Sequence, residues 1–78
     1  MEQQFVYSFP KNEEEEIRFS LREYKDQLYV DIRLFFRTKE GEFMPTKKGL
    51  TLSAGFFGQL ESGVEKLSEL LSVKGGVR

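Results

Sequence analysis

The chain has 78 residues, with 12 basic and 13 acidic side chains and no cysteine or histidine. This length predicts one small domain over residues 1–78, and the absence of cysteine excludes a disulfide and a thiolate metal site. The absence of histidine removes the commonest general base and the commonest metal ligand. A domain of this size buries only about 60–65% of its unfolded surface. Because small domains without cross-links often associate, we expect a dimer.

The net charge of −1 hides an uneven distribution along the chain. Residues 1–16 carry a net charge of −4, residues 17–48 carry +3, and residues 49–78 are balanced. A basic central segment can attract nucleic acid although the whole chain is slightly acidic. The run of glutamates from residue 13 to 16 is predicted to belong to a solvated acidic loop at residues 10–16.

Four segments alternate apolar and polar side chains with the period of a β-strand. They are residues 4–9, 17–24, 27–37 and 43–52. On one parity of the second and third segments lie Ile17, Phe19, Leu21, Leu28, Val30, Ile32 and Leu34; on the other lie Arg18, Ser20, Arg22, Tyr24, Tyr29, Asp31, Arg33 and Phe35. We expect the apolar parity to form the core and the basic parity to face outward.

The third and fourth segments, joined by a turn at residues 38–42, predict a β-hairpin on which aromatic and basic residues are mixed. Cations suit phosphates and flat rings suit bases, so this mixture is typical of a surface that holds a single nucleic-acid strand. The adjacent rings Phe35 and Phe36 break the alternation, and one of them must face outward unless the strand bulges. Simple alternation places Phe36 on the core side, which leaves Phe35 as the competing candidate for base stacking.

From Ser53, a predicted N-cap, the apolar period changes to that of a helix beginning at Ala54. Its apolar stripe comprises Phe57, Leu60, Val64, Leu67 and Leu71. This stripe is wide for a single helix on so small a sheet, so we expect it to form a dimer interface. Gly75 and Gly76 are predicted to end the helix, and residues 74–78 to form a frayed tail.

The predicted element order is therefore four strands followed by one helix. It favours an α+β fold, in which a four-stranded curved antiparallel sheet precedes one C-terminal helix in a homodimer. We expect the helix to cover one face of the sheet and to leave the other face open.

Four short motifs follow one another in this layout: R-E-Y-K at the end of the second strand, V-D-I-R in the third, G-E in the turn and P-T-K-K-G-L-T-L-S before the helix. Residues 17–60 thereby resemble the single-stranded-DNA-binding domain of the transcriptional coactivator positive cofactor four and its small bacterial relatives. The serine-rich extension of the eukaryotic coactivator is absent, which suggests a bacterial or phage-type relative.

The resemblance implies a homodimer whose helices pair and whose strands form grooves for single strands running in opposite directions. It implies stacking by Tyr24 and Phe36 and contacts to phosphates or bases from Lys25, Arg33, Lys47 and Lys48. Two further candidates come from the residues themselves: Arg22 shares the face of Tyr24, and Gly49 would allow a phosphate close to the backbone. Gln27 and Met44 stand where the eukaryotic coactivator has lysines, and Phe36 replaces a tryptophan, which predicts weaker phosphate binding.

The sequence therefore predicts a non-catalytic protein that binds single-stranded DNA largely without sequence preference. It would need no cofactor and would act with transcription or replication proteins in transcription regulation, replication or repair. An enzyme is not expected, because no general base with a partner and no phosphate-binding glycine loop can be nominated. Two alternatives remain open: a single-stranded RNA-binding module on the same surface, and a protein-interaction dimer without nucleic acid.

The N-terminus shows no basic-then-apolar leader, and no apolar run approaches the roughly 18 residues that a membrane span needs. We therefore expect an intracellular protein without a membrane partner, in the cytoplasm or nucleoid of a bacterium or in the nucleus of a eukaryote.

Overall fold

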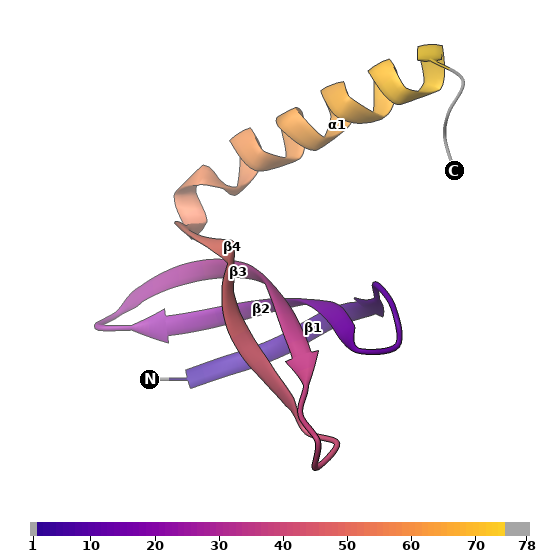
Figure 1. Ribbon diagram of the computed structural model, residues 1–78. Coiled ribbons are helices and arrows are strands. Elements are labelled where there is room, and N and C mark those ends of the chain that lie inside the picture. The colour runs from indigo at the N-terminus through magenta and orange to yellow at the C-terminus, as the bar shows by residue number, and fades with distance from the viewer. Residues whose placement is uncertain (1, 75–78) are drawn as a thin grey trace.

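The computed structural model describes residues 2–74, which form four strands and one helix (Figure 1). The strands are β1 (Glu2–Pro10), β2 (Glu15–Tyr24), β3 (Gln27–Arg37) and β4 (Phe43–Ser53), and they pair antiparallel in sequence order in one open sheet. A short 3-10 turn, η1 (Ala54–Phe56), leads into α1 (Phe57–Lys74). The α+β fold class predicted from the sequence is confirmed. The predicted helix-ending pair Gly75 and Gly76, and the tail beyond Lys74, lie outside the described residues.

Two tight turns fix the register of the first three strands. Between β1 and β2, the side-chain oxygen of Asn12 accepts hydrogen bonds from the backbone N–H groups of Glu14 and Glu15, both at 2.9 Å. The turn is therefore shorter than the acidic loop predicted at residues 10–16, because Glu15 already belongs to β2. Between β2 and β3, Lys25 and Asp26 both take positive φ values, of 51° and 65°, which suits a two-residue hairpin turn.

The face of the sheet that is buried within one chain is the opposite of the one predicted. Ser20, Asp31 and Phe35, all on the parity expected to face outward, are buried. On the apolar parity of β2 and β3 only Leu34 is buried, while Leu28 remains 48% exposed. The alternation itself is confirmed, because cross-strand partners such as Ser20 and Asp31 share a face.

Curvature explains this reversal. The guanidinium carbon of Arg18 in β2 lies 5.2 Å from the ring centroid of Phe5 in β1, 4.5 Å from that of Phe35 in β3 and 5.4 Å from that of Phe43 in β4. Side chains of all four strands can converge in this way only if the sheet curls around them. We call this side of the sheet the concave face and the opposite, mainly apolar side the convex face.

The helix does not cover the sheet. In Figure 1, α1 continues from the end of β4 and extends away from the strands, and none of its residues from 57 to 74 is buried. Its first turns lie near the convex face, where Phe57, Leu60 and Val64 line a hollow of about 350 Å³ together with Phe19 and Ile32. The expectation that the helix buries one sheet face is therefore wrong for the single chain.

The start of the helix also differs from the prediction. The backbone enters η1 at Ala54, as expected, but the Ser53 side chain makes no capping hydrogen bond. The α-helical hydrogen-bonding pattern begins only at Phe57.

A bulge interrupts the pairing of β3 with β4. Arg33 pairs with Gly49 and Phe35 pairs with Pro45, so the three residues 46–48 stand opposite Leu34 alone. Pro45 has no N–H to donate, which fits a position beside the irregularity. The bulge turns Lys47 and Lys48 out of the ladder, and both are exposed.

Gly49 ends this bulge and lets β4 approach β3 closely. A Cβ atom at this position would lie 2.5 Å from the carbonyl oxygen of Ile32 and 2.7 Å from the Cα of Arg33. Both are backbone atoms, so no side-chain rotation relieves the overlap. The sequence suggested a close approach at Gly49, and the structure identifies the neighbouring strand as what lies close.

We expect Gly49→Ala to lower the free energy of unfolding by about 1–3 kcal/mol, because the methyl group overpacks a backbone contact. Urea unfolding followed by circular dichroism measures this loss. Gly41→Ala is the informative control: Gly49 with a φ of 157° and Gly41 with a φ of 89° both have a backbone that is strained for a side chain, but a Cβ at Gly41 meets nothing within 4 Å. If both variants lost the same free energy of unfolding, the effect would come from backbone conformation and not from contact with β3.

Candidate nucleic-acid interface

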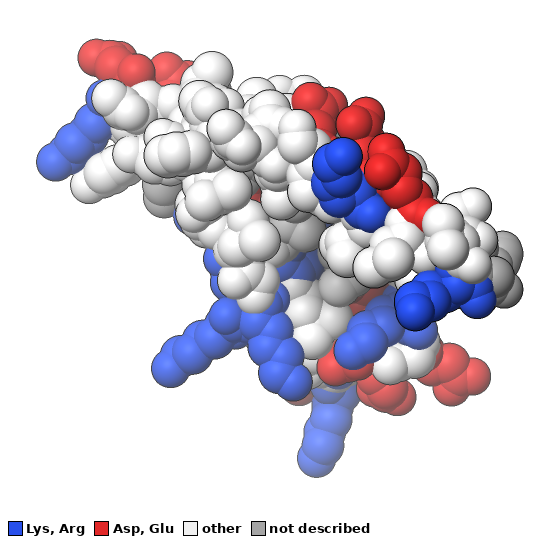
Figure 2. Space-filling view, turned by 90° about the horizontal axis from the view of Figure 1, so that it is seen from above, with Lys and Arg blue, Asp and Glu red and all other residues white. Residues whose placement is uncertain are grey.

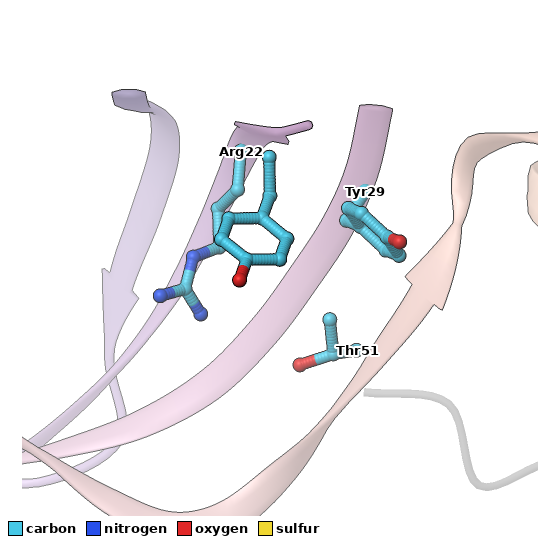
Figure 3. Close-up of a pocket in the computed structure, with 4 residues that line it drawn as sticks. Arg22, Tyr29 and Thr51 are labelled. Carbon is cyan, nitrogen blue, oxygen red and sulfur yellow. The ribbon is translucent and has the colours of Figure 1, made fainter. Parts of the chain in front are cut away.

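The concave face carries a hollow of about 350 Å³ near the β2–β3 turn. Arg22 and Tyr24 of β2, Tyr29 of β3 and Thr51 of β4 line it. In Figure 3, the labelled side chains Arg22, Tyr29 and Thr51 come from three neighbouring strands and surround one space. The register accounts for this meeting, because Tyr29 pairs with Arg22 on one side and with Ser53 on the other.

A hydrogen-bonded network forms the floor beside this hollow. Arg33 donates from Nη2 to Asp31 Oδ1 at 2.9 Å and to Thr51 Oγ1 at 3.1 Å. Its Nε donates to the same carboxylate at 3.2–3.3 Å, and Thr51 in turn donates to Asp31 Oδ1. The Asp31 side chain is only 3% exposed, so the pair ties β3 to β4 from inside the sheet.

The network keeps Asp31 ionised. Burial on its own would raise the pKa of Asp31, but hydrogen bonds from Arg33 and Thr51, with the charges of Arg33 and Arg22, hold it below its ordinary value. The same carboxylate raises the pKa of Arg33, chiefly through their hydrogen bonds. The floor of the hollow therefore carries an ion pair whose two charges neutralise each other, and not a single unpaired charge.

This network leaves Arg33 little freedom to reach a strand of nucleic acid. Besides Asp31 and Thr51, its Nη1 donates to the carbonyl oxygen of Thr46 at 3.1 Å. The Thr46 hydroxyl donates to the Leu34 carbonyl at 2.8 Å and accepts the N–H of Lys48 at 3.1 Å. Arg33, which the sequence suggested as a direct contact, thus supports the bulge that presents Lys47 and Lys48.

Tyr24 and Lys25 lie at the rim of the hollow, where β2 ends. The Tyr24 ring is 48% exposed, and the Lys25 ammonium lies 5.3 Å from its centroid. At this distance the cation and the ring attract each other, which keeps a charge beside an accessible aromatic surface. The structure therefore brings Arg22, Tyr24 and Lys25 together as the sequence suggested.

The two adjacent phenylalanines of β3 have different environments. Phe35 is buried between Arg18 and the edge of Phe5, whose ring centroid lies 5.9 Å away. Phe36 is 42% exposed and pairs with Met44. Phe36 is therefore the accessible ring of the pair, although alternation places it on the side opposite Phe35.

In Figure 2 several lysine and arginine side chains project at the bottom of the view, others lie elsewhere beside acidic side chains, and a broad uncharged surface lies above. Within residues 2–74, no three acidic side chains gather closely enough to hold a metal ion. No helix in the same residues is long and apolar enough to cross a membrane.

Sequence reasoning missed two residues of the hollow. Tyr29 was assigned only to the outward parity of β3, and Thr51 was not singled out. The available signal was their register, because Tyr29 lies opposite Arg22 and Thr51 lies opposite Asp31 once the strands are paired.

Comparison with known proteins identifies the family. Residues 11–62 match the family described as Transcriptional Coactivator p15 (PC4). The chain belongs to the PC4 family. The matched stretch runs from the β1–β2 turn to the beginning of α1, and it includes all the candidate nucleic-acid residues.

Relatives of known function or structure agree with this family. The chain is 34% identical over 55 residues to the RNA polymerase II transcriptional coactivator KIWI of Arabidopsis thaliana, which covers 70% of this chain. It spans only half the length of that relative. A PC4 homologue from Burkholderia pseudomallei superposes with a TM-score of 0.80 at 28% identity, covering 86% of this chain and 98% of its own.

A more distant PC4 homologue, from bacteriophage T5, has a TM-score of 0.66 at 21% identity. It covers 96% of this chain and 83% of its own and shares the fold. The PC4 fold therefore extends over nearly the whole chain, including β1, which lies outside the matched family stretch.

The network in the floor gives a prediction about stability and pH. We expect Asp31→Asn to lower the free energy of unfolding at pH 7 by about 3 kcal/mol, because it leaves the Arg33 charge without its buried partner. Since the folded pKa of Asp31 is depressed, its contribution is complete above its ordinary pKa of about 4 and is lost as the pH falls through the lower folded value. Urea unfolding between pH 7 and pH 2 should therefore show the two proteins converging in acid.

Asp26→Asn is the matched control, because it makes the same chemical change in the exposed β2–β3 turn. It should alter the free energy of unfolding by less than about 0.5 kcal/mol at any of these pH values. If Asp31→Asn were as stable as the unmodified protein at pH 7, the network would not hold β3 to β4.

Proposed function

We propose that this PC4-family chain acts as one domain that binds single-stranded DNA, largely without sequence preference and without catalysis, as a homodimer. The observation that carries the proposal is that Arg22 and Tyr24 line a hollow on the concave face and that the Lys25 ammonium lies beside the Tyr24 ring. An exposed ring beside cations offers a base a surface for stacking and its phosphates a charge. A role in transcription regulation is supported by the similarity to the Arabidopsis coactivator, and a role in DNA replication by the similarity to the phage T5 homologue, which is implicated in recombination-dependent DNA replication.

Lys47 and Lys48 supply further cations at the bulge, away from the hollow, and Lys48 borders a separate hollow with Ile17, Ile32 and Leu34 of the convex side. Both are exposed, and neither makes one of the ion pairs found among the described residues. With Arg22 and Lys25 they supply four cations for phosphates. Phe36 offers a second accessible ring, on the convex side of β3 and therefore away from the hollow. Gly49 belongs to this proposed surface through its backbone, which shapes the bulge.

Four neutralised phosphates give a measurable salt dependence. For a dT oligomer, we expect the logarithm of the binding constant to fall against the logarithm of salt concentration with a slope of about −3. Lys47→Glu and Lys48→Glu should each weaken binding and make the slope shallower by roughly 0.7 or more, because each removes a phosphate contact. Filter binding or fluorescence anisotropy at several salt concentrations measures both effects.

Lys66→Glu supplies the control, because it makes the same charge change on α1, where Lys66 is 81% exposed and lies 3.9 Å from Glu69. It should leave the slope unchanged. Absence of binding to oligo-dT at low salt would refute the proposed function, and an equal effect of all three variants would mean that only net charge matters. Competition between matched DNA and RNA oligomers decides whether the strand is DNA.

The proposed dimer rests on apolar surface that one chain leaves uncovered. Leu28 and Leu50 of the convex face are 48% and 39% exposed. The predicted interface residues Phe57, Leu60, Val64, Leu67 and Leu71 follow one another at alternating spacings of three and four, which places them on one side of α1. Contiguous apolar surface of this kind is uncommon on monomers, and a second copy brings a matching helix and a matching sheet.

Leu67→Asp tests the dimer without disturbing the single chain, in which Leu67 is 62% exposed. Sedimentation equilibrium should show the mass falling from two chains to one, because a charge placed in the apolar contact must be desolvated. Ser62→Asp, which adds the same charge to another side of α1, should leave the mass unchanged. A single-chain mass for the unmodified protein at micromolar concentration would overturn the dimer.

A further inference from the structure

Resting on the proposed function, we propose that the concave hollow is a pocket for one nucleobase and that Tyr29 is its second aromatic wall, opposite Tyr24. The size of the hollow agrees with this assignment, since about 350 Å³ lies near the lower end of the range for small-molecule pockets. It is therefore large enough to admit a single flat ring.

The register places the two tyrosines at a suitable spacing along the strands. Tyr24 pairs with Gln27 across the β2–β3 turn, so Tyr29, two residues further along β3, is its diagonal neighbour on the same face. Diagonal positions of paired strands are roughly 7–8 Å apart, and a base stacked on both sides needs about 7 Å between the flanking rings. The spacing of the two strand positions is therefore compatible with a base between Tyr24 and Tyr29.

The chemistry of the hollow favours a base over a phosphate. Two of its four lining side chains are phenol rings, and the nearest carboxylate, Asp31, is already neutralised by Arg33. The Thr51 hydroxyl is engaged with both of these groups, so Thr51 contributes mainly van der Waals contact. Arg22 supplies the one lining cation, at a position from which it reaches the edge of a base or the adjoining phosphate.

The backbone of Tyr29 is fixed between two strands. Tyr29 is the third residue of β3, is half-buried and is paired with β2 on one side and β4 on the other, whereas Tyr24 lies at a strand end and is half exposed. A side chain on a fixed, half-buried backbone loses less conformational freedom when a ligand stacks on it than one at a strand end. Stacking is also tolerant of base identity, in keeping with binding that shows little sequence preference.

Two probes of equal charge separate base stacking from phosphate binding. One is a 20-nucleotide dT oligomer, and the other is a strand of the same length in which every base is replaced by an abasic residue. We expect Tyr29→Leu, which keeps an apolar side chain of similar bulk but no aromatic face, to weaken binding of the dT oligomer at least about fivefold. Its affinity for the abasic strand and its salt slope should equal those of the unmodified protein, because no cation is lost.

Tyr29→Phe is the matched control and should bind the dT oligomer within about twofold of the unmodified protein, because it retains the ring. Thermal unfolding of both variants checks the fold. A direct measurement uses an oligomer with one fluorescent base analogue, 2-aminopurine, whose emission is quenched by stacking on tyrosine. The quenching should be strong for the unmodified protein and for Tyr29→Phe, and weaker for Tyr29→Leu.

The outcomes distinguish this pocket from the function on which it rests. If the unmodified protein binds neither strand, the proposed function fails and the pocket fails with it. If it binds the dT oligomer but Tyr29→Leu binds equally well, only the pocket is overturned. The same conclusion follows if Tyr29→Leu weakens binding of the abasic strand by the same factor, because the loss would then come from altered structure.

Discussion

The ion pair between Asp31 and Arg33 is the interaction on which the arrangement of the concave face depends. It joins β3 to β4 through Thr51 and reaches the β3–β4 bulge through the Thr46 carbonyl. A buried charge pair contributes little net stability compared with apolar packing, but removing one partner is costly. The ion pair matters here because it positions parts of β4. It fixes where β4 leaves the ladder, and hence where Lys47 and Lys48 project and how close Thr51 lies to Tyr29.

The second constraint is the curvature of the sheet, which gives its two faces different environments. The concave face buries what a single chain can bury, including polar groups that pair with one another. The convex face leaves Leu21, Leu28 and Leu50 exposed, and only the first turns of α1 lie near it, while the rest of the apolar stripe extends beyond the sheet. In the proposed homodimer a second copy covers the convex face and the stripe, and the concave face keeps the hollow that is proposed to hold a base.

The sequence predicted the elements well because their signals are local. Alternation in β2 and β3, the glycine-containing β3–β4 turn and the helical stripe of α1 each depend on neighbouring residues. The prediction of which strand parity is buried was wrong. Burial depends on the curvature of the sheet and on where α1 docks, and neither is determined by neighbouring residues. The same limit applies to the site. Tyr24 and Lys25 could be identified from a motif, whereas Tyr29 becomes a candidate only when the register places it opposite Arg22.

Arg33 shows how a motif leaves two roles open that the structure weighs differently. In V-D-I-R the aspartate and arginine are two residues apart, so a strand places them side by side on one face. The sequence left open whether Arg33 contacts nucleic acid or pairs with Asp31. The network favours pairing, because carboxylate, hydroxyl and carbonyl partners occupy most of its donors. Its contribution to binding is then indirect, through the geometry of the bulge.

These features together shift the proposed binding mode from charge toward stacking. The resemblance drawn from the sequence implies that Gln27 and Met44 stand where the eukaryotic coactivator has lysines, Arg33 is engaged internally, and the whole chain carries a net charge of −1. Fewer cations remain for phosphates, so less of the affinity comes from counterion release. The hollow between Tyr24 and Tyr29 supplies the compensating interaction, because stacking on an aromatic face contributes about 1–3 kcal/mol per base and is not screened by salt as an ion pair is. A chain with this distribution of residues would hold a single strand mainly by its bases and orient it by a small number of phosphates.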